Sequence, residues 1–400
     1  MKKVTSENFF FTTGSVIEFV VSLEKSDYIP KVINNLIKAI SGFRIKEKNG
    51  FLELHNDPIN IIKLPKNVDN PFDAVLYSEK YCSPNPKKAL ASIAANDSCV
   101  SVVTSHSITD GGFYRRLIQH LLDDHIKQVN VIPSTVNELF KKELDKIKLN
   151  KNDPNNLEFV TKNNFSYPSL NIPRDTFRIN ISNSIDIKDL QCYNKTNKKV
   201  IGLTESLILA IALSMSAMNN KNEPLKIGCQ NCVDLRKYMN PEDINEYVGS
   251  NYSIVDVVMK NVKGSYSLRE AGKILRKDLN KKIEKDMIMK SIKGFGSAQS
   301  QPKLVACLSN VGQFKFNSPI KDMYIQQSMF SKGFEVEIAL SCFSKIGNGM
   351  NTIETNLKYP QSVVSEKDAS KINKSIKYIL TQVSPDSTID ETISKIRKIE

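Results

Sequence analysis

Hydrophobic positions recur along the first part of the chain with two different periods. Short runs of β-branched and aromatic residues alternate with longer segments in which apolar residues stand three or four positions apart. The first pattern predicts strands and the second predicts amphipathic helices. We predict a strand, a helix, a hairpin that turns at Asn49-Gly50, and a second buried strand: 15–23, 28–40, 43–48 with 51–54, and 98–104.

The second part of the chain repeats this alternation. We predict a strand at 176–181, a polar loop at 194–199 and an apolar helix at 204–218 that is capped by Thr204. A strand at 225–233 and a basic amphipathic helix at 268–292 follow. Three strands, at 304–308, 323–328 and 334–342, and a final helix that begins at Ser365 complete the prediction. Residues 141–174 are rich in Lys, Asn and Pro without a sustained period, so they are predicted to form a long linker or a surface excursion. The pattern indicates an α/β protein.

The chain has 400 residues, which suits two domains or two similar halves of roughly 200 residues. We place the halves at 1–175 and 176–400. No apolar run reaches the ~18–20 residues of a membrane span, and polar residues interrupt the N-terminal region where a signal peptide would be apolar. Seven scattered cysteines are typical of free thiols in a reducing compartment. These features predict a cytoplasmic protein without a membrane span.

The charge balance narrows the class of partner. There are 56 Lys and Arg residues against 43 Asp and Glu residues, which gives a net charge of +13. An excess of this size favours acidic partners: nucleic acid, an anionic membrane surface, or a cosubstrate that carries phosphate. Charge alone does not choose among them.

The strongest local motif lies between a predicted strand and a predicted helix. It reads His106-Ser-Ile-Thr-Asp110-Gly111-Gly112. A histidine at the end of a strand, on a turn made by two glycines, would present its imidazole to a cleft, where its near-neutral pKa suits a general base. The alternative is an Asp-Gly turn with an incidental surface histidine.

Three further segments favour the catalytic alternative. They follow in order along the second half: Val233–Met239 with its Asp-Leu-Arg, Tyr247–Tyr252 with its Gly-Ser-Asn-Tyr, and Leu308–Phe314 with its Ser-Asn-Val-Gly. With the histidine motif they give a chain that resembles the CoA-dependent acyltransferase superfamily of chloramphenicol acetyltransferase and the condensation domains. The alcohol acetyltransferase-like branch is the most similar.

The resemblance implies two chloramphenicol-acetyltransferase-like halves, each a mixed sheet covered by helices, with a tunnel between them. His106 would lie in the tunnel as the general base, reached by the thioester from one face and by the acceptor from the other. Asp110 would be structural, with Arg236 as its salt-bridge partner. A strand-end arginine in solvent is the alternative for Arg236.

Two departures from the family stand out. Many members have two adjacent histidines, and here the first position is Ser105. The plant-type branch has an aromatic DFGWG motif where this chain has Ser309 and Asn310, and the chain contains no Trp. Ser309 or Asn310 could donate a hydrogen bond near the tetrahedral oxyanion, or could only shape the end of a strand.

The basic helix is the densest candidate for binding the phosphates of coenzyme A, and we expect Lys273, Arg276 and Lys277 to face the ligand, with Gly111 and Gly112 beside the substrate. A solvated helix face is the alternative for the three cations, because acidic residues alternate with them. No permanently bound cofactor and no metal are expected. Cys229 and Cys232 have the spacing of a metal pair, but residues three apart in a strand face opposite sides.

The leading hypothesis is an acyltransferase that moves an acyl group from acyl-CoA, or from an acyl carrier protein, to an alcohol or amine. It would act as a monomer on a small molecule and would not bind nucleic acid. A catalytically inactive member that serves as a binding or scaffold protein is the first alternative, supported by Ser105. A basic nucleic-acid-binding protein is the second, and it rests on the net charge alone.

Overall fold

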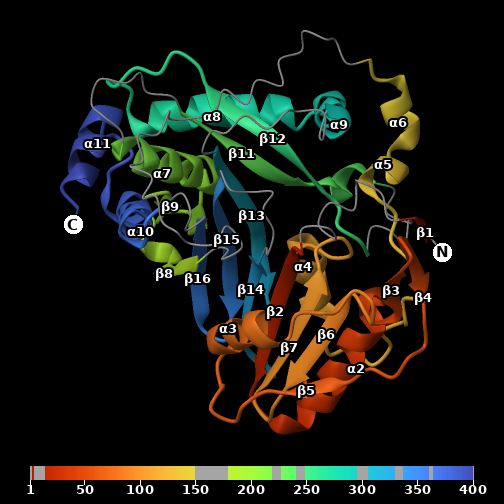
Figure 1. The fold of residues 1–400 in the computed structure, drawn as a ribbon. Helices are drawn as coiled ribbons and strands as arrows, with labels where there is room; N and C mark the ends of the chain where they lie inside the picture. The colour runs from red at the N-terminus through yellow and green to blue at the C-terminus, as the bar shows by residue number, and fades with distance from the viewer. Residues whose placement is uncertain are drawn as a thin grey trace.

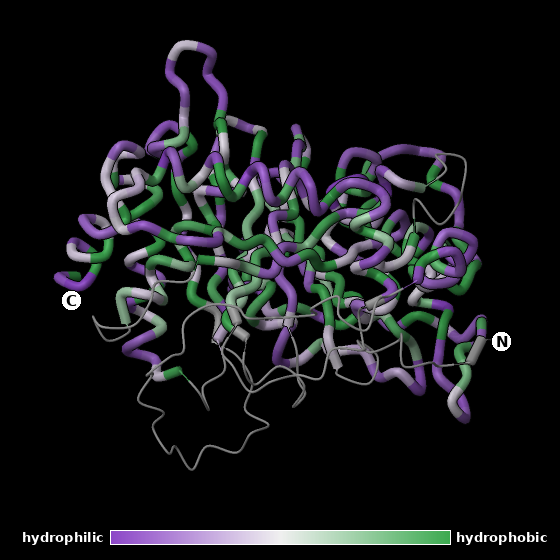
Figure 2. The backbone as a smooth tube through the Cα atoms, turned by 90° about the horizontal axis from the view of Figure 1, so that it is seen from above, coloured by the Kyte–Doolittle hydropathy of each residue, from purple (hydrophilic) through white to green (hydrophobic). Residues whose placement is uncertain are grey.

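Two mixed β-sheets, each covered by helices, form the molecule in a computed structural model (Figure 1). The structure describes residues 2–3, 14–148, 179–218, 227–239, 248–294, 305–328, 337–359 and 364–399. The mixed sheets under helices confirm the predicted fold class. In the view from above, the N- and C-termini lie at opposite sides of the molecule (Figure 2).

The N-terminal lobe is built on a five-stranded sheet. Its spatial order is β14-β2-β7-β6-β5, with bounds Ile320–Ser328, Val16–Leu23, Cys99–Ser105, Ala91–Ala95 and Ile61–Lys63. One face bears Ser101, which bonds Ser78 of α3 at 2.6 Å, and the other bears Phe19, whose ring stacks on Tyr114 of α4. The helices of this lobe are α2, α3 and α4, with bounds Ile29–Ala39, Pro71–Tyr81 and Gly111–His120.

A small sheet at the edge of this lobe contains the predicted hairpin. Its order is β1-β4-β3, with bounds Lys2–Lys3, Phe51–Leu54 and Ile45–Lys48. Asn49 and Gly50 both have positive φ, 53° and 79°, as a two-residue turn between antiparallel strands requires. The hairpin prediction and the helix predicted over 28–40 are both confirmed.

The C-terminal lobe is built on a six-stranded sheet. Its order is β12-β11-β13-β15-β16-β8, with bounds Tyr252–Met259, Ile227–Asp234, Val305–Lys315, Glu337–Gly347, Met350–Tyr359 and Ile179–Asp186. Helices cover the apolar face: α7, α8, α9, α10 and α11, with bounds Leu203–Ala217, Leu268–Lys282, Lys285–Gly294, Glu366–Gln382 and Ile389–Arg397. Minor elements complete the lobe: α5, α6, β9, β10 and the 3₁₀ turn η5, at Val136–Leu139, Lys141–Lys146, Tyr193–Asn194, Lys199–Val200 and Leu235–Tyr238.

β14 links the two lobes. Its residues fall in the predicted second half, yet the strand pairs antiparallel with β2 at the edge of the N-terminal sheet, with Gln326 opposite Glu18 (Figure 1). The chain therefore returns to the first lobe after β13 and goes back to the second with β15. The first lobe is therefore one unit in space but is built from two separate parts of the sequence.

Several predicted boundaries were wrong for local reasons. The helix expected from Thr204 begins one residue earlier, and its N-cap is Gly202 in place of Thr204; the Gly202 φ of 78° is one that glycine adopts without strain. The single helix expected over 268–292 is two helices, because the buried stripe that ends at Leu279 would next place Lys282 and Asp286 in the core. The chain turns there, and Ile288, Met289 and Ile292 form a new stripe: these three are all buried.

The strands predicted at 304–308, 323–328 and 334–342 are each longer than expected, and β16 was not predicted. The expected excursion at 141–174 begins with the short helix α6, and its residues from 149 on lie outside the described residues. None of the helices in the described ranges is long and apolar enough to span a membrane.

Candidate active site

His106 lies immediately after β7, where the first lobe meets the second. Its backbone N–H donates to the Ser15 carbonyl at 2.9 Å, which fixes the end of β7 against the start of β2. We expected the imidazole to face a cleft, but the residue is only 5% exposed. Its surroundings come from both lobes, so the histidine is held between them.

The hydrogen bonds of the imidazole define its tautomer. Nδ1 lies 2.9 Å from the Thr109 carbonyl oxygen, and because a carbonyl only accepts, Nδ1 carries the proton. The lone pair of the neutral ring is then on Nε2. The Ser250 hydroxyl lies 3.3 Å from Nδ1, on the same side of the ring. This is the protonation state that a general base needs.

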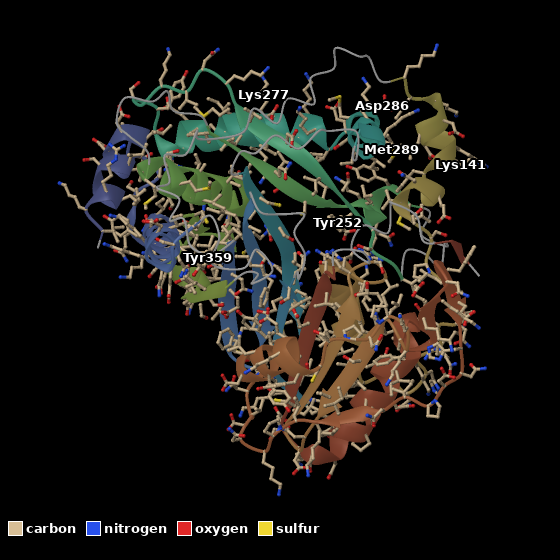
Figure 3. The ribbon with its side chains drawn as sticks, in the orientation of Figure 1. Lys141, Tyr252, Lys277, Asp286, Met289 and Tyr359 are labelled. Atoms are coloured by element: carbon tan, nitrogen blue, oxygen red, sulfur yellow. The ribbon has the colours of Figure 1, made fainter. Side chains whose placement is uncertain are left out.

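Tyr252, the first residue of β12, stacks on His106. The ring centroids are 5.2 Å apart and the planes differ by 20°. Figure 3 shows Tyr252 at the junction of the lobes, directly above α4. Burial lowers the pKa of His106, and the Asp110 carboxylate and the Thr109 carbonyl oppose part of that shift. The imidazole is therefore neutral at neutral pH.

Asp110 caps α4 and joins it to the second lobe. Its Oδ1 accepts the Phe113 N–H at 2.8 Å, the usual N-cap bond, and its Oδ2 accepts the Asn251 N–H at 2.7 Å. Burial alone would raise the pKa of this carboxyl, but Arg236 and the two backbone donors together hold it below the usual value. Asp110 is therefore a buried carboxylate.

Arg236 and Asp110 form the ion pair that the resemblance implies. Arg236 Nη2 lies 2.9 Å from Asp110 Oδ1 and Nη1 lies 3.0 Å from Oδ2, so the contact is bidentate. The two residues are 3% and 4% exposed, which excludes a strand-end arginine in solvent. Arg236 also contacts Asp234 Oδ1 at 3.2 Å and the Gly249 carbonyl at 3.1 Å.

A second arginine extends this network and was not predicted. Arg115 of α4 lies 3.2 Å from Asp234 Oδ2, and its Nη1 donates to the Val311 carbonyl in β13 at 3.1 Å. The sequence offered little sign of this contact, because 119 positions separate Arg115 from Asp234. With Asp110 and Arg236 it makes a four-residue ionic network between the lobes.

The two glycines after Asp110 were expected beside the substrate, on a turn. Neither has positive φ, and both belong to the first turn of α4. A Cβ on Gly111 would lie 2.5 Å from a Val311 methyl, and one on Gly112 would lie 2.6 Å from Arg236 Nη1. Close approach to β13 and to the ion pair, not backbone conformation, requires glycine here.

Gly112→Ala should therefore destabilise the protein by about 1–3 kcal/mol, because the new methyl must displace a buried guanidinium. Chemical denaturation measures this loss. Gly272→Ala is the matched control: a Cβ there meets Glu205 at 3.5 Å, an ordinary contact, within helix α8. The control should be neutral or slightly stabilising. Equal stabilities of the two variants would contradict the packing role of Gly112.

Ser309 and Asn310 lie within β13, not at its end. Asn310 Oδ1 accepts the Gly312 N–H at 3.2 Å and its Nδ2 donates to the Thr204 hydroxyl at 3.2 Å, across a bulge where the pairing register shifts. Gly312 has a φ of 93°, and a Cβ there would lie 2.6 Å from Arg115. These contacts of Asn310 hold the bulge inside β13, and a role of Ser309 or Asn310 at the oxyanion stays a prediction.

The basic helix does not join this site. Arg276 pairs with Glu205 of α7, and Lys273 and Lys277 are exposed on α8. Figure 3 shows Lys277 on the outer side of the second lobe, while Tyr252 lies at the lobe junction. The fold places these three cations away from His106, and their predicted contact with the phosphates of the donor stays a prediction. Within the described residues no group of His, Cys, Asp and Glu side chains could hold a metal ion.

Comparisons with known proteins identify the fold. No family model matches the chain, and no curated protein sequence matches it. A variant of the starter condensation domain of rhizomide synthetase, solved in complex with C8-CoA, has a TM-score of 0.64 at 9% identity, over 97% of this chain and 96% of that one. Polyketide synthase associated protein 5 from Mycobacterium tuberculosis has a TM-score of 0.62 at 12% identity, over 97% of this chain and 98% of that one.

The epimerization domain from the third module of tyrocidine synthetase B gives a TM-score of 0.59 at 14% identity, over 99% of this chain and 96% of that one. These similarities span whole chains on both sides. The protein therefore has the two-lobed fold of these condensation and epimerization domains. The alcohol acetyltransferase-like branch stays a prediction.

Proposed function

From this fold we propose that the protein is an acyltransferase that moves an acyl group from a thioester to a hydroxyl or amine, with His106 as general base. The observation that carries the proposal is the bond between His106 Nδ1 and the Thr109 carbonyl, from which the tautomer of His106 follows. A buried imidazole between two lobes, with its proton held on Nδ1 by the Thr109 carbonyl, directs a basic nitrogen away from its own loop.

In the proposed reaction the oxygen or nitrogen of the acceptor attacks the thioester carbonyl, and His106 Nε2 takes the proton that this atom loses. The tetrahedral intermediate then expels the thiolate, which receives the proton from the imidazolium. The proton has then moved from the acceptor to the leaving thiol by way of His106, and the enzyme is unchanged. The Tyr252 ring would favour the imidazolium in between, because the face of an aromatic ring attracts a cation.

The donor is proposed to be an acyl-CoA or a carrier-bound acyl thioester. In support, a protein of this fold was solved with C8-CoA, and others are domains of multimodular synthetases. Asp110 and Arg236 are proposed as positioning residues, since they fix the loop on which His106 and Thr109 lie.

Release of free thiol tests the function directly. The purified protein is incubated with acetyl-CoA, octanoyl-CoA or an acylated carrier protein, together with a panel of alcohols and amines. Thiol release that depends on the acceptor supports the proposal. Tight binding of coenzyme A without release from any donor would favour the inactive scaffold instead.

Tyr252 offers a test of the imidazolium step. Tyr252→Leu should lower the apparent pKa in the pH profile of kcat/KM, because the aliphatic side chain cannot stabilise the charged ring, by up to about one unit. Tyr252→Phe keeps the aromatic face and should leave the profile in place. An unchanged profile in the leucine variant would remove Tyr252 from the mechanism.

A further inference from the structure

A layer of buried polar side chains lies where the N-terminal sheet meets β16 of the C-terminal sheet. We call it the buried polar layer: Glu18 of β2, Gln326 and Ser328 of β14, Asn356 and Lys358 of β16, and the half-buried Glu79 of α3. The first five are between 0% and 4% exposed. Such a concentration of polar groups inside a protein requires partners for each of them.

Most of the layer is internally bonded. Glu79 accepts from the Ser328 hydroxyl at 2.7 Å and from Gln326 Nε2 at 3.4 Å. Asn356 Oδ1 accepts from the Ser182 hydroxyl at 2.8 Å and from the Tyr324 hydroxyl. These bonds tie α3, β14, β16 and β8 together around the remaining members.

The carboxyl of Glu18 is not bonded in this way. The residue is 0% exposed, and neither carboxyl oxygen has a hydrogen-bond partner in the described part of the chain. The Ser328 hydroxyl and the backbone N–H of Glu18 both lower the pKa of this carboxyl, and the Ser328 hydroxyl donates its single hydrogen to Glu79 at 2.7 Å. Asn356 Nδ2, also at 0% exposure, has no acceptor among the described residues. Buried groups of this kind hold water or a ligand.

The charges of the layer indicate which ligand would fit. Two carboxyls, Glu18 and Glu79, lie within electrostatic range of one ammonium, Lys358, and the Tyr114 hydroxyl is a further titratable group near Glu18. Burial raises the pKa of Glu18 to about 8; the Lys358 charge works against the rise and Glu79 adds to it. Glu18 is then protonated at neutral pH, and a second ammonium is what would let it ionise.

The layer also lies near His106. Ser15, whose carbonyl accepts the His106 N–H, is three residues before Glu18 on the same chain, about 10 Å at the rise of a strand. The Lys358 charge lowers the pKa of both His106 and Glu18, so the ammonium is within electrostatic range of both. The separation between the two residues is within the length of a small extended molecule.

We propose that the buried polar layer binds a positively charged amino group of the acceptor, with Glu18 as its direct ligand. The acceptor is then a compound with two nucleophilic ends, a diamine or an amino alcohol, held by its ammonium at Glu18 while the other end meets His106. The identity of the acceptor rests on the proposed function, whereas the ammonium site does not.

Calorimetry tests the site without catalysis. Diaminohexane is titrated into the wild-type protein at pH 7 in two buffers of different ionisation enthalpy. Binding with a heat that depends on the buffer is expected, because Glu18 releases its proton when the ammonium binds. Glu18→Gln should weaken binding roughly ten- to a hundredfold and remove the buffer dependence. Glu284→Gln, an exposed acid, is the matched control. Absence of binding, or binding unchanged in Glu18→Gln, would overturn the site and leave water as its occupant.

Kinetics separates the site from the reaction. If diaminohexane is acylated with a lower KM than hexylamine, and Glu18→Gln raises the KM for the diamine alone, the ammonium site selects the acceptor. Equal KM values for the two amines in the wild type would overturn that selection. Failure of every thiol-release assay would remove the proposed function while the calorimetric result still decides on the ammonium site.

A folding control keeps the variant interpretable. Because the folded-state pKa of Glu18 lies above its unfolded value, the folded protein binds more protons than the unfolded chain between roughly pH 4.5 and 8, and stability contributed by the neutral carboxyl is lost as pH rises through that window. Glu18→Gln should therefore unfold at higher denaturant concentration than the wild type at pH 7, with the difference shrinking toward pH 4. A less stable variant at pH 7 would show that Glu18 is ionised and partnered, which contradicts the proposal.

Discussion

His106→Ala should lower the rate of acyl transfer about 10²–10⁴-fold, the usual contribution of a general base. The substitution removes the ring that bears Nε2, while the backbone bond from residue 106 to Ser15 is kept. Because the ring is buried against Tyr252 and Thr109, some stability will be lost with it, so circular dichroism and denaturation must accompany the rate. Thiol release at saturating donor and acceptor is the measurement.

His120→Ala is the matched control. This histidine lies at the end of α4, its side chain is 65% exposed, and it contacts only Asp123 among the interactions described. It should retain wild-type turnover. Near-wild-type turnover in His106→Ala would exclude the histidine from the mechanism and put the scaffold hypothesis first.

The pH dependence follows from the same environment. Burial lowers the pKa of His106 from its usual value near 6.5, so kcat/KM should be level across neutral pH and fall only as the pH drops through that lowered pKa. The Asp110 carboxylate acts in the other direction, and its removal should move the fall to lower pH still. An inflection above pH 7 would indicate a different base.

Asp110→Asn should cost about 3–5 kcal/mol of stability, because Arg236 would keep a buried charge without its bidentate partner. Activity should fall together with stability, since Asp110 also fixes α4 through Phe113 and the second lobe through Asn251. The stability that Asp110 contributes depends on its ionised carboxyl. This stability is present above the unfolded-state pKa near 4 and is lost as the pH falls through the lower pKa of Asp110 in the folded protein.

The double variant Asp110→Asn with Arg236→Gln isolates the pair. Its loss should be smaller than the sum of the single losses by at least about 1 kcal/mol, the coupling typical of residues in one network. Asp234→Asn gives a graded comparison, because that carboxylate is one-third exposed and should couple more weakly to Arg236. A coupling of about 0.5 kcal/mol or less between Asp110 and Arg236 would contradict the pairing.

Much of the local structure could be predicted because local physics decides it. The turn at Asn49-Gly50 and the N-cap of α10 at Ser365 each depend on a few neighbouring residues, although α10 is followed by α11 and is not the final helix that was predicted. The fold class followed from the alternation of strand and helix periods together with ordered motifs. The pairing of β14 with β2 had no local signal, since nothing near residue 320 specifies a partner at residue 23.

The candidate site was predicted unevenly for the same reason. His106, Asp110 and Arg236 could be named from motifs, whereas Arg115 and Glu18 lie in ordinary helix and strand patterns. Gly111 and Gly112 were placed at a turn because glycine often marks a positive φ. Here the residues are glycine because Val311 and Arg236 leave no room for a Cβ. The distance of the α8 cations from His106 could not be predicted, because charge density in sequence does not show which side of a sheet a helix covers.

The return of β14 to the first sheet has a consequence for synthesis of the chain. Until Ile320–Ser328 leaves the ribosome, β2 is an open edge that runs past the carboxyl of Glu18, and the sheet ends one strand short. Such an edge can pair with another chain, and a contact spanning some 300 residues forms slowly. The first lobe is therefore expected to wait, incomplete and prone to association, until most of the second has been made. The junction of the two lobes, which contains His106 and the buried polar layer, then forms as one of the last events of folding.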